Sequence, residues 1–325
     1  MGMPETPKTF CKAPFRSSVI STDGALLPCC EYMNNESNDP VYRLDSQNKS
    51  TFKEWWERGL DPLRQKMLKG EVDPGCNYCI SKEKNPGLGH HRIVMNDRIS
   101  ADYEKIKNDY HAGTKDYPSI VELRIGNFCN LKCIMCGPYA SSSLEAEYKM
   151  NKEKFDSLGI HSSAVNGDWY KHDHNKDTVF DVVANAREIN FGGGEPFISP
   201  WIIEILQVID SKTPLQFNTN MTKINDKVLN ALEKFDSVYI IASIDGVGKH
   251  NNYLRHGSDW SVIEDNFKKF QSMPNVRIEI GYILQHSSVY TLQNVVEFAN
   301  TNNIWIWMSE VADDSGHLGI NSVPT

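Results

Sequence analysis

Residues 120–136, IVELRIGNFCNLKCIMC, decide the fold because they join a strand-like run to a loop with three cysteines. The run Ile120–Ile125 is rich in aliphatic residues, which predicts a buried strand. Cys129, Cys133 and Cys136 follow it with the spacing C-x3-C-x2-C. In an α/β fold, the loop after a strand's carboxyl end faces the active site. We therefore expect the three thiolates to gather at that edge of a sheet.

Strand-like and helix-like segments alternate from residue 118 onward, and the strands are dense in Val and Ile. This alternation predicts a parallel sheet covered by helices, closed by right-handed crossovers into a barrel or an open arc. We expect an α/β fold, a partial (β/α)6 barrel over 118–325, with an insertion at 137–186. The expected strands are Ile120–Ile125, Glu188–Phe191, Leu215–Asn218, Val238–Ile244, Val276–Leu284 and Ile304–Met308, and the expected helices lie at 199–211, 225–235, 258–272 and 288–301.

Residues 1–82 lack this alternation and are expected to form a small, irregular, cysteine-rich domain. A tight turn at Thr22-Asp23-Gly24 predicts a hairpin. Thr51 and Glu54 form a capping box that predicts a helix start, and Gly70 is expected to end the helical region. Residues 83–117 are predicted to be a polar linker with one helix at about 93–108.

Composition narrows the function classes. The net charge of −8 gives no overall basic field, which argues against nucleic acid as a partner. No apolar run is long enough to cross a bilayer, and the first ten residues, MGMPETPKTF, lack an apolar signal core, which favours the cytoplasm and no membrane partner. The chain stops soon after the sixth expected strand, which suggests truncation or a missing C-terminal segment.

The eight cysteines are clustered, as expected for metal binding in a reducing compartment. Three thiolates on one short loop can hold three irons of a cubane and leave the fourth iron open to a small molecule. The alternative is a zinc knuckle, which normally needs a second ligand pair nearby. The nearest histidine downstream of Cys136 is His161, which favours the cluster.

The cysteine loop resembles the signature of the radical S-adenosylmethionine (SAM) superfamily, and the resemblance extends through most of residues 118–310. Gly193-Gly194-Glu195-Pro196 is similar to the GGEP motif of that family, and Ser243-Ile244-Asp245-Gly246 to its SIDG segment. Thr219-Asn220 matches a Thr-Asn-Gly turn, with Met221 in place of the glycine. The family would place the adenine near Met135 and a carboxylate near Arg255.

Each of these short motifs could by itself be an ordinary turn, but each follows an expected strand on the same edge. The resemblance implies catalytic cluster ligands Cys129, Cys133 and Cys136. It also implies that SAM contacts Met135, Gly193, Gly194, Glu195, Pro196, Asn220, Ser243, Asp245 and Arg255. Glu195 would pair with the amino group of SAM.

Five further cysteines precede the barrel: Cys11, Cys29, Cys30, Cys76 and Cys79. Their spacing resembles the SPASM or twitch module, which holds an auxiliary iron–sulfur cluster in radical SAM enzymes and usually follows the barrel. Cys11, Cys76 and Cys79 are the expected ligands, with Cys29 or Cys30 as the fourth and Cys29 favoured. A structural zinc site is the alternative. The pairs His90-His91 and His172/His174 are interpreted as solvated loop residues.

The resemblance implies an enzyme that cleaves SAM reductively at a [4Fe–4S] cluster, and the resulting 5′-deoxyadenosyl radical abstracts hydrogen from a substrate. An electron donor such as flavodoxin or ferredoxin would supply the electron. A peptide or protein is the leading expectation for the substrate, with a small metabolite, nucleotide or RNA as alternatives. A hypothesis from another class is a non-catalytic iron–sulfur protein that transfers electrons.

Overall fold

The fold is described from a computed structural model of the chain. It describes residues 6–33, 42–47, 51–84, 91–113, 117–158, 168–310 and 318–319. The chain forms two compact units: the first comprises Met1–Leu123 and Asp168–Glu188, and the second Arg124–Gly167 and Ile189–Thr325. Part of the expected insertion, from Asp168 onward, therefore belongs with the N-terminal residues. His161, considered above as a ligand, lies outside the described residues, and so does His90.

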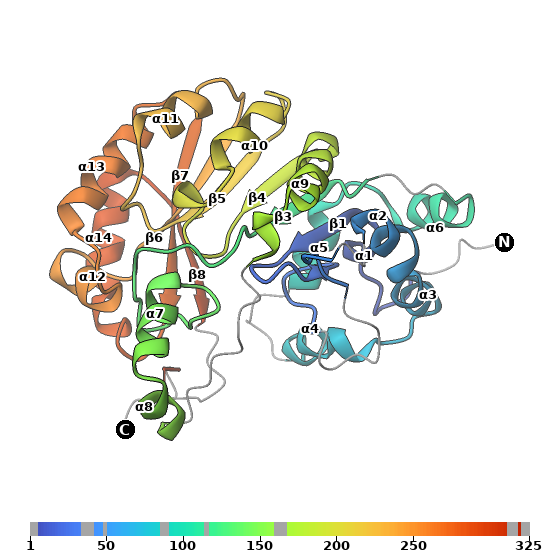
Figure 1. Cartoon of the computed structure of the whole chain (residues 1–325), viewed down its shortest axis with the longest axis horizontal. Coiled ribbons are helices and arrows are strands. Elements are labelled where there is room, and N and C mark those ends of the chain that lie inside the picture. Colours follow the sequence, from blue (N-terminus) through green and yellow to red (C-terminus); the bar gives the residue numbers. More distant parts are fainter. Residues whose placement is uncertain are drawn as a thin grey trace. The chain divides into compact units, whose positions relative to one another are not determined.

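Parallel strands in chain order form the sheet of the second unit (Figure 1). The strands are β4 (Glu188–Phe191, which begins at the unit boundary), β5 (Leu215–Thr219), β6 (Val238–Ser243), β7 (Val276–Leu284) and β8 (Ile306–Glu310). Between neighbouring strands a helical crossover returns the chain to the same end of the sheet, so every strand points the same way. The expected α/β class with a parallel sheet is confirmed.

The helices of the second unit are α7 (Ser142–Met150), α8 (Lys152–Ser157), η5 (Pro196–Ile198), α10 (Ile202–Val208), α11 (Asp226–Leu232), α12 (Lys249–Leu254), α13 (Trp260–Gln271), η6 (Val289–Thr291) and α14 (Leu292–Asn302). Among them, α10, α11, α13 and α14 correspond to the four helices predicted at 199–211, 225–235, 258–272 and 288–301, with shifted ends. Helix α12 has no counterpart among the predictions. Figure 1 shows α10, α11, α13 and α14 along one face of the sheet.

The two faces of this sheet differ in burial. Side chains of β5 and β6 alternate between buried and more exposed positions along each strand. The buried set includes Phe217, whose ring stacks on Phe191 at 4.5 Å and on Phe197 at 4.9 Å between centroids. The opposite face carries more polar side chains, with Gln216 aligned to Tyr239 and Asn218 to Ile241. The sheet therefore has one face that is covered by helices and one face that is partly open to solvent.

The strands of the first unit pair in both senses. Strand β1 (Ser17–Ile20) pairs antiparallel with β2 (Leu26–Leu27) and parallel with β3 (Ile120–Leu123). The predicted hairpin is present, with Gly24 at φ +81° in its turn. The other elements are α1 (Ala13–Arg16), α2 (Phe52–Glu54), the π-helix η2 (Trp55–Gly59), α3 (Asp61–Lys69), η3 (Pro74–Cys76), α4 (Asn77–Lys82), α5 (His91–Arg98), α6 (Tyr103–His111), η4 (Trp169–Lys171) and α9 (Asp173–Asn185).

Local sequence signals explain several of these ends. The Thr51 side chain accepts a hydrogen bond from the Glu54 amide at 3.0 Å, as the capping box predicts. Gly70 ends α3 in the left-handed conformation at φ +75°. The single helix predicted at 93–108 is instead two helices, α5 and α6, because Asp102 caps a new helix by accepting from the Lys105 amide. Among the described residues, no helix is long and apolar enough to cross a membrane.

Candidate active site

The loop with Cys129, Cys133 and Cys136 is held against the end of β4 by a glycine turn. The Glu195 amide donates to the Phe128 carbonyl at 2.6 Å. Gly193 and Gly194 have φ values of +65° and +49°. A side chain at Gly194 would collide with the Phe128 carbonyl oxygen. Only glycine at this position allows the two backbones to approach so closely.

Helix α7 holds the same loop through a run of serines. The Ser141 hydroxyl caps α7 by accepting from the Leu144 amide at 3.2 Å and donates to the Leu131 carbonyl at 2.6 Å. The Ser142 hydroxyl accepts from the Cys129 amide at 3.1 Å, and the Ser143 hydroxyl donates to the Cys129 carbonyl at 2.9 Å. These contacts fix the backbone of the cysteine loop.

The carboxylate of Glu195 is buried where the ends of β4 and β5 meet. One oxygen accepts from the Phe197 amide and from the Thr219 hydroxyl, at 3.2 and 2.8 Å, and the other accepts from the Asn220 amide at 2.7 Å. Burial raises the pKa of Glu195 to about 7, although these hydrogen bonds lower it. Both oxygens are thus already bonded within the protein, which makes Glu195 a link between strand ends as well as a candidate partner for an amino group.

Asn220 and Met221 complete the turn after β5. The side-chain Nδ2 atom of Asn220 lies 3.8 Å from the Cys129 sulfur. The side-chain oxygen of Asn220 accepts a hydrogen bond from the Thr222 backbone amide at 2.9 Å. Met221 is fully buried and has φ +63°, and it is one of three non-glycine residues with positive φ in the described ranges. The turn therefore keeps the left-handed backbone of the expected Thr-Asn-Gly turn, although a methionine occupies the glycine position.

A buried ion pair lies at the end of β6. Arg255 pairs with Asp245 through a 2.8 Å contact, and its guanidinium lies 3.9 Å from the Cys133 sulfur. The other Asp245 oxygen accepts from the Ile283 amide at 2.7 Å. Amides of the cysteine loop donate to the Leu254 and His256 carbonyls, at 3.0 and 2.8 Å. Arg255 is thus locked beside the cysteines. Ser243 ends β6 on the partly open face of the sheet.

The thiols differ in their electrostatic surroundings. Burial raises the pKa of Cys129 to about 11. A hydrogen bond from Cys136, with help from the Arg255 charge, lowers the pKa of Cys133 to about 7, and the same pairing raises the pKa of Cys136. Met135 packs on the buried group formed by Cys129, Leu131 and Cys133. Thiols on one braced loop beside a fixed cation form a donor set that fits an iron–sulfur cluster, whose thiolate charges Arg255 would offset.

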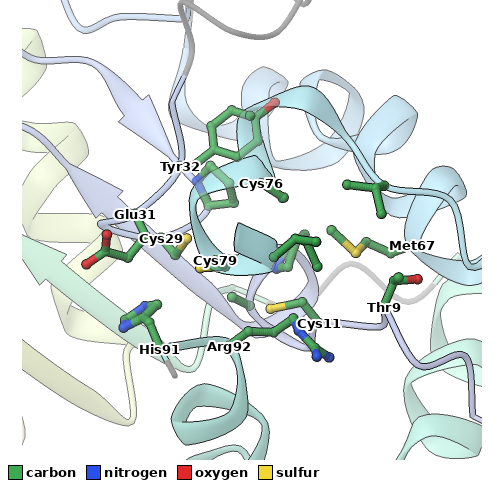
Figure 2. Close-up of a pocket in the computed structure, with 16 residues that line it drawn as sticks. Thr9, Cys11, Cys29, Glu31, Tyr32, Met67, Cys76, Cys79, His91 and Arg92 are labelled. Carbon is green, nitrogen blue, oxygen red and sulfur yellow. The ribbon is translucent and has the colours of Figure 1, made fainter. Parts of the chain in front are cut away.

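The first unit contains a second gathering of cysteines. Cys11, Cys29, Cys76 and Cys79 line one pocket that is partly open to solvent (Figure 2). Burial raises the pKa of Cys11 to about 11 and that of Cys79 to about 12. It also raises the pKa values of Cys29 and Cys76, and repulsion from the neighbouring thiolates adds to the effect. Thiols with such raised pKa values ionise readily only when they bind a metal.

Buried contacts bring these distant cysteines together. The Asp73 carboxylate, fully buried, caps the Cys76 turn through the Gly75 amide at 2.9 Å and accepts from the Tyr32 hydroxyl at 3.1 Å. A side chain at Gly75 would collide with the Tyr32 ring, so a larger residue there would displace the ring from its place against this turn. On the other side, Arg92 of α5 donates to the Phe10 carbonyl at 2.9 Å and so holds the Cys11 segment.

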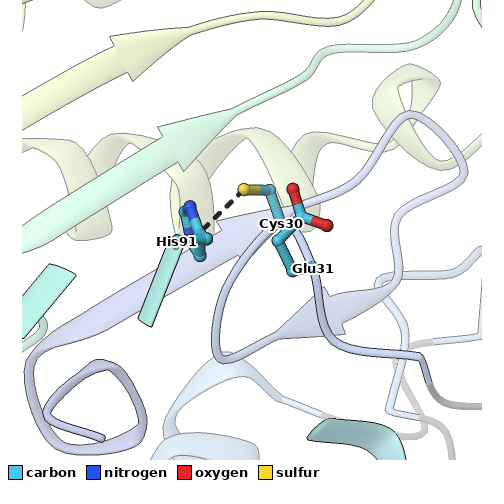
Figure 3. A group of neighbouring side chains, drawn as sticks. All are labelled: Cys30, Glu31 and His91. Atoms are coloured by element: carbon cyan, nitrogen blue, oxygen red, sulfur yellow. Dashed lines mark hydrogen bonds between the residues drawn. The ribbon is translucent and has the colours of Figure 1, made fainter. Parts of the chain in front are cut away.

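Cys30 does not line this pocket and faces His91 instead. Its sulfur lies 3.6 Å from the His91 Nε2 atom (Figure 3). The interpretation of His91 as a solvated loop residue was wrong, because His91 is half-buried at the start of α5 and burial lowers its pKa. His174 is also half-buried, and its ring nitrogen contacts the Asp45 carbonyl at 3.0 Å.

Sequence reasoning overlooked the serines of α7 and helix α12, whose last residue, Leu254, accepts a hydrogen bond from the cysteine loop. The signal for the first was visible as Ser141-Ser142-Ser143 directly before a helix, a pattern typical of caps. The contact of Tyr32 with Asp73 and Gly75 leaves no comparable pattern, because Tyr32 is far from the other two residues in the chain. His91 carried only a weak signal, since it lies beside a glycine-containing stretch.

Residues 123–286, half of the chain, match the radical SAM superfamily. The chain belongs to this superfamily. Membership implies an enzyme with a [4Fe–4S] cluster and SAM, and the matched region contains the cysteine loop, the glycine turn, Asn220, Asp245 and Arg255. No curated protein is similar enough in sequence to match the chain.

Solved structures with similar folds share little sequence with this chain. "Native anSMEcpe with bound AdoMet" is 18% identical, with a TM-score of 0.43, over 60% of this chain and 51% of that one. Streptococcus suis SuiB bound to S-adenosylmethionine is 17% identical, with a TM-score of 0.45, over 78% and 57%. SuiB bound to the precursor peptide SuiA is 16% identical, with a TM-score of 0.44, over 82% and 55%. The chain thus spans little more than half the length of these proteins.

Proposed function

We propose that this chain reductively cleaves SAM at a [4Fe–4S] cluster held by Cys129, Cys133 and Cys136. One observation carries the proposal: the braced cysteine loop, the glycine turn and Asn220 meet at the carboxyl ends of adjacent parallel strands. When bound, the cluster would supply one electron to the sulfonium of SAM, and the 5′-deoxyadenosyl radical formed by C–S cleavage would abstract a hydrogen atom from substrate.

The protein's own groups would bind and orient SAM. Gly193 and Gly194 leave backbone accessible at the strand end, where SAM would lie. Met135 offers an apolar surface for the adenine, and the polar groups near Ser243 suit the ribose. Pro196 starts η5 and fixes the end of the turn. Arg255 has little freedom to reach a SAM carboxylate while it pairs with Asp245, so we propose that its charge acts mainly on the cluster thiolates.

The substrate we favour is a peptide or protein. The sheet face opposite the helices carries Gln216, Asn218 and Tyr239, which are half-buried or exposed and polar. Such a face could hydrogen-bond an extended chain while leaving the cysteine edge open to SAM. A small metabolite, a nucleotide or RNA remains an alternative, and flavodoxin or ferredoxin is the electron donor we propose. We propose a cytoplasmic location on the basis of the reduced, clustered thiols.

We further propose that Cys11, Cys29, Cys76 and Cys79 hold an auxiliary iron–sulfur cluster in a SPASM- or twitch-like domain over residues 1–82. The pocket contains Cys29 and not Cys30, which supports Cys29 as the fourth ligand. Four thiolates around one zinc ion would lie about 3.8 Å apart. Within the described part of the chain, these cysteines do not form a group with all ligand atoms within 4.8 Å. Wider spacing suits a cluster better than zinc.

The test is anaerobic reconstitution followed by reaction with SAM and dithionite. The enzyme should release 5′-deoxyadenosine, and a Cys129/Cys133/Cys136→Ala variant should release none while keeping about half of the iron. Mock reactions without dithionite provide the control. If fully loaded wild-type chain bound no SAM and released no 5′-deoxyadenosine, the non-catalytic electron carrier would replace the enzyme as the best interpretation.

A further inference from the structure

Cys30, Glu31 and His91 lie together in the first unit, and neither proposed cluster uses them. In the described part of the chain they are the only group of three or more His, Cys, Asp or Glu side chains whose ligand atoms lie within 4.8 Å of one another. Figure 3 shows the thiol and the imidazole facing each other, with Glu31 beside Cys30. We propose that these three side chains form a mononuclear Zn²⁺ site.

The spacing of the donor atoms fits a tetrahedral zinc ion. Zinc binds sulfur at about 2.3 Å and nitrogen at about 2.05 Å, so the two donors of a tetrahedral ion lie about 3.6 Å apart. The Cys30 sulfur and the His91 Nε2 atom are 3.6 Å apart. This distance matches the separation of two ligands of one ion, and it also lets the thiol and the imidazole hydrogen-bond to each other when no ion is bound.

Hydrogen bonds within the protein position both ends of the site. Cys30 and Glu31 lie on the turn after β2, which is tied to the Cys76 turn by the Met33 amide donating to the Gly75 carbonyl at 3.0 Å. His91 begins α5, and its neighbour Arg92 is fixed by a 2.7 Å bond to Glu83. Folding therefore already orders these ligands, so metal binding costs little further conformational entropy.

The local charges also favour a cation. A deprotonated Cys30 and Glu31 would bring two negative charges to a half-buried site, and the Glu122 carboxylate also acts on His91. The opposing charge is that of Arg98, which is ion-paired with Glu188. A divalent ion would balance the two anionic ligands directly.

The ligand set is the mixed sulfur, nitrogen and oxygen set that zinc accepts. Three protein ligands leave one coordination position for water or an anionic group, which is the arrangement of reactive zinc sites. Glu31 and His91 also line the cysteine pocket, so the site borders the proposed auxiliary cluster while using a different cysteine. This inference does not depend on SAM cleavage.

The experiment uses full-length chain with its iron–sulfur clusters reconstituted, then incubated with zinc and desalted. We expect about one zinc per chain, and X-ray absorption at the zinc edge should show one sulfur neighbour together with nitrogen and oxygen neighbours. Four sulfur neighbours would place zinc among Cys11, Cys29, Cys76 and Cys79, and this result would overturn the proposal. Absence of retained zinc in the cluster-loaded chain would overturn it as well.

Variants then separate the two centres. Cys30→Ser and His91→Ala should each lose zinc and keep the wild-type iron content, which also reports correct folding. Glu31→Gln should weaken zinc binding by at least the roughly 10- to 100-fold that is typical when a supporting group is removed. His174→Ala, which removes another half-buried histidine of the same unit, should retain zinc. Loss of iron in Cys30→Ser would instead assign Cys30 to the cluster and contradict the zinc site.

Discussion

Glu195 places a titratable carboxyl group in the interior of the candidate site, with a pKa raised by burial to about 7 from an ordinary 4.5. The folded chain therefore binds this proton more tightly than the unfolded chain between these values. Its contribution to stability is fully present below pH 4.5 and is lost as the pH rises through 7, by on the order of 3 kcal/mol at most.

Infrared difference spectra of the chain check this prediction for Glu195. A protonated carboxyl band should titrate with a midpoint near pH 7, and it should disappear in Glu195→Gln but persist in Glu204→Gln. The free energy of unfolding of Glu195→Gln should also vary less over this pH range. A carboxyl group that stayed ionised down to pH 5 would show that its three hydrogen bonds outweigh burial.

Met221 combines a strained backbone with a buried side chain, so two substitutions can separate the effects. Met221→Ala should cost about 2–5 kcal/mol through the lost packing and should keep the strain. Met221→Gly loses the same packing but relieves about 1–2 kcal/mol of strain, against about 0.5–1 kcal/mol of added backbone entropy. Urea unfolding should find Met221→Gly more stable than Met221→Ala by about 0.5–1 kcal/mol. The opposite order would contradict a strained turn.

At the scale of elements, α7 acts as a brace for the cysteine loop. Ser141→Ala removes the helix cap and leaves the Leu131 carbonyl without its donor, so it should cost about 1–3 kcal/mol and lower iron retention. Asn225→Ala is the matched control, because Asn225 likewise caps a helix, α11, by accepting from the Val228 amide at 3.1 Å. The control should lose about 1 kcal/mol and keep its iron. Equal iron loss in both variants would indicate general destabilisation only.

The elements of the second unit were predictable because local signals and packing agree there. Each expected strand has a run of aliphatic residues, and caps such as Asn225 mark the helix starts. The end of the sheet was displaced, with β8 at Ile306–Glu310 instead of Ile304–Met308. Trp305 and Trp307 fit a strand in either register, so local pattern could not decide between them. Helix α12 was missed because its six residues carry no apolar periodicity.

At the scale of the whole molecule, the sequence pattern did not predict which distant segments fold together. Residues 168–188 pack in the first unit because Trp169 donates to the Thr22 carbonyl at 3.0 Å and Asn175 donates to the Asp45 carbonyl at 3.0 Å. Neither contact has a signature in sequence. The same limit applies to the Cys30–His91 pair, because neither residue alone indicates that the other lies 3.6 Å away.

The two proposed clusters draw their ligands from different units, since Cys129, Cys133 and Cys136 lie in the second unit and the pocket cysteines in the first. We therefore expect a Cys11/Cys76/Cys79→Ser variant to fall from about eight irons per chain to about four. Because every proposed SAM contact lies in the second unit, this variant should still release 5′-deoxyadenosine with SAM and dithionite. Iron and 5′-deoxyadenosine assays on the same preparation check both statements. Loss of all iron would show that the cluster at Cys129, Cys133 and Cys136 cannot form without the auxiliary cluster. The two sites would then have to be treated as one cooperative assembly.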